Sequence, residues 1–204
     1  SFDLATGAQW EAGMKQTLWD KRAEWTLAYF DIFRKNILTQ TSLTTAQNVG
    51  RQTSKGIELS GAIRPTDAWR LQGNLTFLSA RFADFSESEG GNVVSRIGNR
   101  PPNVPETMAN LWSMYRVPFV VPFDLGAAFR YVGHRYADNA NAVRLHAYTT
   151  ADAWISVPYQ NMTITLRGRN LLDKTYAIWA DPFYPSQVLI AAPRTVELML
   201  VARF

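Results

Sequence analysis

Two histidines, His134 and His146, are the residues that could most simply bind a metal ion or act as a catalytic base. Neither has a second histidine or a carboxylate at the spacing that metal sites use, so we expect both to be structural or solvent-exposed. A Ser-His-Asp triad could be drawn with His134 and Asp138, but no nucleophile-elbow motif supports it. The sequence has no cysteine, which excludes a thiolate nucleophile and a disulfide framework. We therefore predict no catalytic residue, no metal site and no cofactor.

Nucleotide and nucleic-acid binding have no support in the sequence. No G-x-G-x-x-G or P-loop motif occurs. The 21 Lys and Arg against 17 Asp and Glu give a net charge of only +4, and the basic residues form no block. The longest apolar stretches, Val117 to Phe123 and Val188 to Pro193, are far shorter than the roughly 18 residues of a membrane-spanning helix. Any binding site must therefore be sought on the faces of strands and in the loops between them.

Alternation of apolar and polar residues dominates the chain. From Trp69 to Thr76 the odd positions are apolar or glycine and the even positions are polar, as in a strand whose two faces meet different surroundings. Most predicted strands reach the roughly 9 to 11 residues that a tilted strand needs to cross a bilayer. The second and fifth carry large apolar residues on both faces, so we expect a bulge there. We predict about nine strands, near residues 8–18, 23–34, 53–64, 69–82, 106–116, 123–135, 147–157, 161–170 and 194–204.

The connections between these strands alternate strictly in length. Short turns are predicted at residues 19–22, 65–68, 117–122 and 158–160, and long connections at 35–52, 83–105, 136–146 and 171–193. Outer-membrane barrels have short periplasmic turns at one rim and long extracellular loops at the other. The alternation therefore predicts an all-β, antiparallel up-and-down transmembrane β-barrel segment.

Aromatic residues gather near the predicted strand ends, as in the girdles with which barrels meet the membrane–water interface. They are Trp10, Trp19, Trp25, Trp69, Tyr115, Tyr131, Tyr136, Tyr148, Tyr159 and Phe204.

Six segments of the chain occur in the order and spacing of one known family. They are LAYFDIFRKNI (27–37), SKGIELSGAIRPTDAWRLQGNLTF (54–77), GNRPPNVPE (98–106), FRYVGHRY (129–136), GRNLLDKTY (168–176) and the terminal PRTVELMLVARF (193–204). The set resembles the carboxyl-terminal part of a TonB-dependent outer-membrane receptor and is most similar to the ferric-siderophore receptors. The resemblance covers essentially the whole chain.

This resemblance implies a barrel of about 22 strands, closed by an N-terminal plug domain that pairs with TonB. Residues 1–204 hold no plug, and nine is an odd number where single-chain bacterial barrels have an even one. We therefore expect residues 1–204 to be one carboxyl-terminal barrel segment, roughly the last two fifths of a receptor, with two open edges. Phe204 resembles the terminal aromatic residue that the barrel-assembly machinery recognises.

The resemblance also places a ligand site in the long connections. A ferric siderophore is a bulky, often anionic chelate, for which Arg supplies charge and Tyr or Trp supplies stacking and hydrogen bonds. Alternatively, Arg81, Arg96 and Arg100 ion-pair with Asp84, Glu87 and Glu89 or with lipopolysaccharide phosphates. Arg144 also lies in these connections. The predicted ligand-binding residues are Arg81, Arg96, Arg100, Arg135, Tyr136, Tyr176, Trp179 and Tyr184.

The polar faces of the strands are expected to line a wet lumen of mixed charge. Alternatively, these side chains serve only in solvation and in hydrogen bonding between the wall and the plug. The positions are Glu58, Arg70, Gln72, Asn74, Arg130, Asp152, Thr163, Thr165, Arg167, Glu197 and Arg203.

The resemblance implies an outer-membrane receptor without enzymatic activity. Such a receptor imports a ferric siderophore and is driven by TonB through the missing plug. Haem and cobalamin receptors share the same barrel pattern. Its expected partners are the ferric chelate, TonB, outer-membrane lipid and lipopolysaccharide, and the barrel-assembly machinery. Two alternatives stay open: a passive porin or structural barrel, and a soluble β-sandwich or lipocalin-like module, in which the apolar faces pack against a second sheet.

Overall fold

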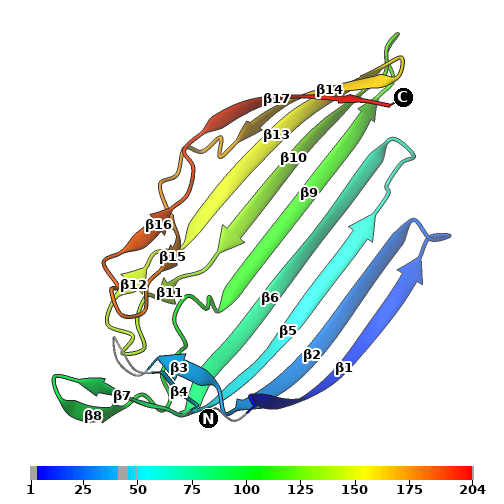
Figure 1. Cartoon of the computed structure of the whole chain (residues 1–204). Helices are drawn as coiled ribbons and strands as arrows, with labels where there is room; N and C mark the ends of the chain where they lie inside the picture. Colours follow the sequence, from blue (N-terminus) through cyan, green and yellow to red (C-terminus); the bar gives the residue numbers. More distant parts are fainter. Residues whose placement is uncertain (1–3, 41–45, 49, 204) are drawn as a thin grey trace.

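Nine long strands form one antiparallel sheet in the order in which they occur in the chain (Figure 1). The structure is a computed structural model that describes residues 4–40, 46–48 and 50–203. Each of the nine matches a predicted strand, which confirms the all-β, up-and-down architecture. The described elements include no helix that could span a membrane. The strands are β1 (Thr6–Leu18), β2 (Ala23–Lys35), β5 (Arg51–Ile63), β6 (Trp69–Asp84), β9 (Thr107–Val117), β10 (Phe123–Val132), β13 (Tyr148–Tyr159), β14 (Met162–Arg169) and β17 (Thr195–Ala202).

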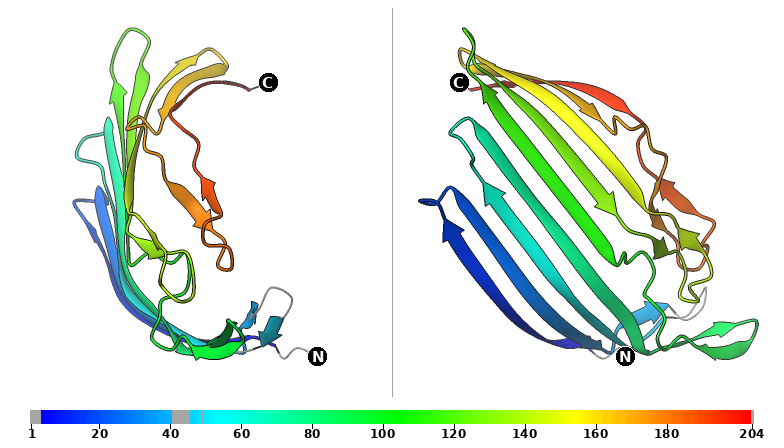
Figure 2. Two further views of the ribbon diagram at one scale, coloured as in Figure 1. Left: turned by 90° about the vertical axis from the view of Figure 1, so that its left-hand side faces the viewer. Right: turned by 180° about the vertical axis from the view of Figure 1, so that it is seen from behind.

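The sheet is curved but does not close. β1 and β17 stand at its two ends and pair with β2 and β14 only, among the described residues. Figure 2 shows the sheet from its side as an open trough. Within the described ranges no second large sheet faces it, so the β-sandwich alternative is wrong for this chain. The predicted open edges are present.

Strand register places the polar residues on one face. Asn74 lies opposite Ser60 on β5 and Asn110 on β9, and the same alternation runs through the other ladders. Every strand position predicted to line the lumen lies on this face. It is the concave face, because the hairpin that follows Tyr176 lies on the concave side and Tyr176 stacks on Tyr148 of the same face (Figure 2).

The opposite, convex face is apolar and exposed. Leu111 and Phe129, which face each other on β9 and β10, are each 50% exposed. Other large apolar side chains are exposed on this face. They include Trp10, Met14, Ile57, Phe77, Leu125, Leu166, Val196, Leu198 and Leu200. An apolar surface of this extent is what the hydrocarbon of a membrane covers.

The bulge expected in the second and fifth strands is absent. The β2–β5 ladder runs without a register shift from Ala23 to Lys35, and β9 pairs regularly with both neighbours. Asp31 stays in register because it faces Lys55 across the strands, with 3.7 Å between carboxylate and ammonium. The described part of the large sheet has one shift, between Arg51 and Gln52.

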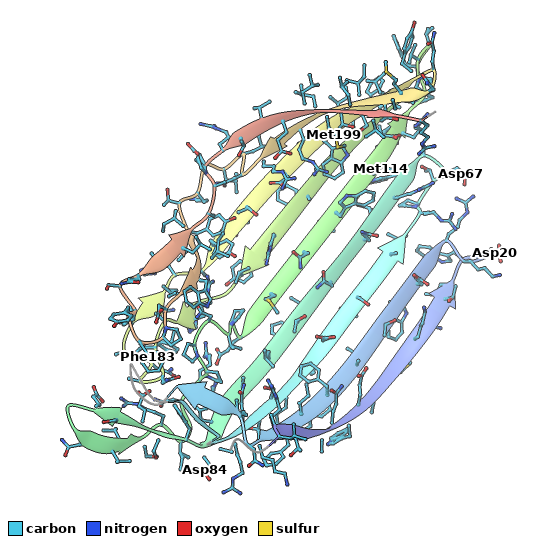
Figure 3. The ribbon with its side chains drawn as sticks, in the orientation of Figure 1. Asp20, Asp67, Asp84, Met114, Phe183 and Met199 are labelled. Carbon is cyan, nitrogen blue, oxygen red and sulfur yellow. The ribbon has the colours of Figure 1, made fainter. Side chains whose placement is uncertain are left out.

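Short and long connections lie at opposite ends of the sheet. Asp20 and Asp67 mark the end with the short turns, and Asp84 marks the other (Figure 3). We call the second the loop end. Each of its long connections carries a two-stranded hairpin. The strand predicted over residues 123–135 is therefore shorter than expected: it ends at Val132, and Arg135 belongs to the hairpin that follows. The hairpins are β3 (Leu38–Gln40) with β4 (Ala46–Asn48), β7 (Ser86–Glu89) with β8 (Asn92–Ser95), β11 (Arg135–Tyr136) with β12 (Arg144–Leu145), and β15 (Ala177–Ala180) with β16 (Val188–Ile190).

Two adjacent alanines at the middle of β10 test which face meets lipid. Ala127 lies on the convex face and Ala128 on the concave face, opposite Asp152. Ala127→Lys is expected to destabilise the full-length protein in lipid vesicles by about 2 to 4 kcal/mol, because it buries a charge in hydrocarbon. Ala128→Lys is the matched control and should stay near the unsubstituted protein. Denaturant titration of the refolded protein measures both, and equal losses would refute the assignment of faces.

Candidate functional site

Asn103 joins three of the long connections at the loop end. Its backbone N–H donates to the carbonyl oxygen of Tyr136 at 2.7 Å. Its side-chain amide donates to the carbonyl of Ala180 at 2.8 Å and accepts the Ala180 N–H at 2.9 Å. A φ of 63° puts Asn103 in the left-handed region, which asparagine tolerates better than most residues. Hairpins β11–β12 and β15–β16 are thereby held on the connection between β6 and β9.

A second set of asparagines extends this network. The side chain of Asn141 exchanges two 2.8 Å hydrogen bonds with the backbone of Arg100. Asn99 donates to the carbonyl of Asn139, and the Asn139 side chain donates to Glu87 at 2.7 Å. Buried Ala137, Leu145 and Ala180 form a small apolar core. The loop end therefore has an ordered interior of its own.

Arg96 is held by two acids of its own connection. Its guanidinium lies 2.7 Å from Glu87 and 2.5 Å from Glu89, across the β7–β8 hairpin. Burial opposes its charge, but the two carboxylates outweigh burial and raise the pKa of Arg96 above its ordinary value. Arg96 thus forms the ion pairs that stood as the alternative to ligand binding.

Arg81 and Arg100 share Glu106. Arg81 reaches this carboxylate at 3.2 Å, and Arg100, only 6% exposed, also forms an ion pair with it. Asp84, one expected partner of these arginines, is held by Arg51 at 3.0 Å. Burial would raise the pKa of Glu106, but the hydrogen bond from Arg81 and the charges of Arg100 and Arg81 lower it below its ordinary value.

Arg135 is the most buried of the predicted arginines, at 2% exposure. Its guanidinium donates to the carbonyls of Ala177 and Ile178, at 2.9 Å for the second. It also lies 5.7 Å from the ring centroid of Tyr148. Arg135 therefore attaches β15 to β11 and offers little of its charge to a ligand.

The four predicted aromatics fall into two groups. Tyr176 stacks on Tyr148, with ring centroids 3.9 Å apart, and Tyr136 lies beneath the guanidinium of Arg100 at 5.4 Å. Burial, with the neighbouring Tyr148, raises the pKa of the Tyr176 phenol, which keeps it protonated and able to donate a hydrogen bond. Trp179 and Tyr184 are 46% and 47% exposed.

Two cavities meet at Tyr176, one of about 490 Å³ and one of about 470 Å³. The first is also lined by Arg144, His146 and Lys174, and the second by Arg130. Sequence reasoning assigned Arg130 to the wall, placed Arg144 in a loop without choosing it as a ligand residue, and gave Lys174 no role. These residues come from β10, β12 and the connection before β15, so they line neighbouring cavities only in the folded chain, and no sequence motif marks them.

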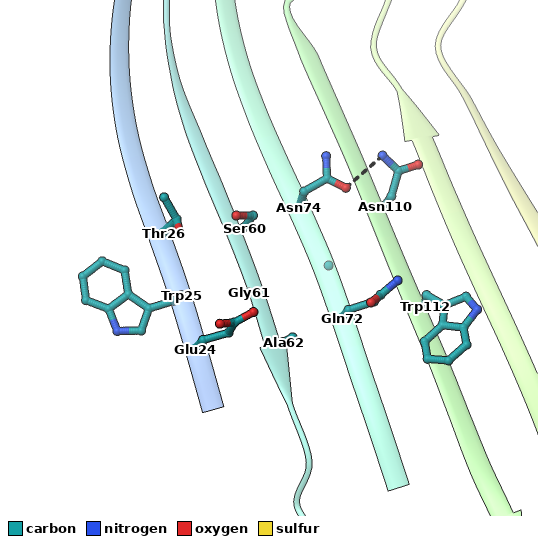
Figure 4. Close-up of a pocket in the computed structure, with 11 residues that line it drawn as sticks. Glu24, Trp25, Thr26, Ser60, Gly61, Ala62, Gln72, Asn74, Asn110 and Trp112 are labelled. Atoms are coloured by element: carbon teal, nitrogen blue, oxygen red, sulfur yellow. Dashed lines mark hydrogen bonds between the residues drawn. The ribbon is translucent and has the colours of Figure 1, made fainter. Parts of the chain in front are cut away.

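A polar groove of about 300 Å³ follows the concave face toward the short turns (Figure 4). Glu24, Gln72 and Trp112 line it, and Asn110 donates to Asn74 at 3.2 Å. Among the described residues, no group of three or more His, Asp or Glu could hold a metal ion.

Beside this groove, aromatic rings lie on the concave face. The rings of Trp112 and Trp154 are 5.9 Å apart, and Arg167 lies 5.2 Å from the Trp154 ring. Trp154 fits because Gly126 has no side chain, as a Cβ there would come within 1.9 Å of the indole. Phe204 lies outside the described residues, and its role in barrel assembly stays a prediction.

Replacement of Asn103 tests whether it orders the loops. Asn103→Gly keeps the positive φ accessible and removes only the side chain, which leaves the Ala180 N–H and carbonyl without partners. Hydrogen exchange in β15 and β16 should speed up, by about tenfold or more, while β5 and β6 stay unchanged. The control is Asn92→Gly, at an exposed hairpin position. Unchanged exchange at Ala180 would show that Asn103 does not secure the hairpin.

The ion pairs of Glu106 predict an acid-sensitive loop end. A carboxylate whose pKa is lowered by folding stabilises the fold above its unfolded pKa, and this contribution disappears as the pH falls through the folded pKa. Exchange of amides near residues 98–106 should therefore accelerate as the pH falls below about 4, after correction for the intrinsic rate. Glu106→Gln should remove this pH dependence. A dependence that persists in the variant would assign it to another group.

The curated relatives of this chain include several receptors. The chain is 31% identical to the metal-pseudopaline receptor CntO of Pseudomonas aeruginosa and 25% identical to the ferrioxamine receptor of Yersinia enterocolitica. Both matches cover 94% of this chain, but only 28% and 27% of those receptors. The chain therefore spans less than a third of the length of these relatives.

Solved structures give the same fold. The siderophore receptor PiuA of Acinetobacter baumannii superposes with a TM-score of 0.79 at 28% identity, over 95% of this chain and 28% of that one. Residues 2–171 match the family described as TonB dependent receptor-like, beta-barrel. The predicted resemblance and the bacterial outer-membrane location are therefore confirmed, and the chain belongs to the β-barrel family of TonB-dependent receptors.

Proposed function

We propose that this chain is the carboxyl-terminal barrel segment, residues 1–204, of an outer-membrane receptor that imports a ferric siderophore or a similar metal chelate. The observation that carries the proposal is the pair of cavities at Tyr176, at the loop end of the barrel wall. Several relatives are receptors for siderophores or metal chelates by name, which supports the same ligand class.

The residues predicted to bind the ligand have different roles at the loop end. Trp179 and Tyr184 are exposed and suited to first capture, and Tyr176 is suited to hydrogen bonding within the cavities. Tyr136 supports the buried Arg100. Arg81, Arg96, Arg100 and Arg135 act mainly as positioning residues, since their guanidinium groups hold the loops together.

Transport through this receptor is driven by TonB, acting on a plug domain in another part of the protein. The polar groove of the concave face supplies hydrogen-bonding groups along the wall. Outer-membrane lipid and lipopolysaccharide cover the apolar convex face, and the barrel-assembly machinery inserts the barrel. The chain itself has no catalytic role in this scheme and needs no resident cofactor.

Growth on a panel of ferric chelates tests the proposal. Deleting the gene of the full-length receptor should abolish growth on at least one chelate when iron is otherwise withheld. A plasmid copy should restore growth in a strain with TonB and should not do so in a strain without it. Growth on excess inorganic iron is the control.

Each other outcome points to a different function. Unchanged uptake of every chelate after deletion would contradict the siderophore proposal. Uptake that is lost on deletion but continues without TonB would favour a passive porin.

A further inference from the structure

Most positive charges at the loop end are already neutralised within the protein. Arg51, Arg81, Arg96 and Arg194 lie within 3.2 Å of a carboxylate, and Arg135 is occupied by backbone carbonyls. These residues cannot offer a full charge to a ligand without first breaking contacts that order the loops.

Among the described residues, three cations that line the cavities at Tyr176 have no such partners. Within the described part of the chain, the side chains of Arg130, Arg144 and Lys174 form no ion pair and no hydrogen bond. All three are exposed at the surface of the protein. All three also line the cavities that meet at Tyr176, with Arg144 and Lys174 on one side and Arg130 on the other.

Acids offset only part of the charge of these cations. No Asp or Glu lines the cavity that holds Arg144 and Lys174, and Asp173, next to Lys174 in the chain, is held by Arg194 at 3.2 Å. In the other cavity the single acid, Asp152, accepts the backbone N–H of Asn170 at 2.9 Å, but it keeps its negative charge and offsets that of Arg130. The excess of positive charge therefore lies at Arg144 and Lys174, beside the protonated Tyr176 phenol.

We propose that Arg130, Arg144 and Lys174, arranged around Tyr176, select a ferric chelate that carries negative charge on the oxygens entering these cavities. This inference rests on the proposed import function and names the charge class of its ligand. Anionic oxygens form short, charge-assisted hydrogen bonds with Arg and Lys. An anion also relieves the repulsion among the three cations, whereas a neutral or cationic chelate does not.

Binding of three ferric chelates of similar size to the purified full-length receptor tests the inference. They are an anionic tris-catecholate, a neutral tris-hydroxamate and a tris-hydroxamate with a pendant amine. The unsubstituted receptor should bind the anionic chelate most tightly, and added salt should weaken this binding.

The decisive variant is the double substitution Arg144→Gln with Lys174→Gln. Its affinity for the anionic chelate should fall by about tenfold or more, with a weaker salt dependence and no change for the neutral chelate. The charge-conserving pair Arg144→Lys with Lys174→Arg should recover much of the affinity. Lys35→Gln, at another exposed cation of the loop end that lines neither cavity, should behave like the unsubstituted receptor.

The outcomes separate this inference from the import function. Equal losses for anionic and neutral chelates, no loss for either, or a preference for the neutral or cationic chelate would each overturn the charge selection and leave import standing. Failure of the receptor to bind any ferric chelate would overturn both.

Discussion

The rest of this structure depends on an almost unbroken ladder of backbone hydrogen bonds across nine antiparallel strands. In hydrocarbon every N–H and carbonyl group needs a partner within the protein, so the ladder must be continuous where the wall crosses the membrane. Because side chains alternate along each strand, the register also decides which residues meet lipid and which meet the lumen. A shift by one residue would turn Asn74 outward and Leu75 inward.

At the loop end, hydrogen bonds from side chains hold neighbouring connections together, as the backbone ladder holds neighbouring strands together in the wall. Asn103 and Asn141 pair with backbone groups of neighbouring connections, and Arg135 binds the carbonyls of β15. These polar groups form hydrogen bonds that hold the long connections together, so they are not available to a ligand. Tyr176, which we propose contacts the ligand, stacks on Tyr148, and its hydroxyl group has no hydrogen-bond partner among the described residues.

The strands were predictable because alternation is a local property of the sequence. All nine appear close to their predicted bounds, and the lumen positions from Glu58 to Glu197 lie on one face. The expected bulge in β2 was wrong because a charge on the outer face, Asp31, can stay in register beside Lys55. The partners of Arg81 and Arg135 were not predictable, because they come from connections 25 and 42 residues away. Only the folded loops decide such pairings.

The packing of Trp154 on Gly126 has a mechanical consequence for the lumen. An indole that stood upright from the wall would be an obstacle to anything passing along it. Laid against a residue without a side chain, the same ring lies close to the sheet. Gly126 therefore lets the concave face carry a large aromatic ring that projects only a short way from the wall.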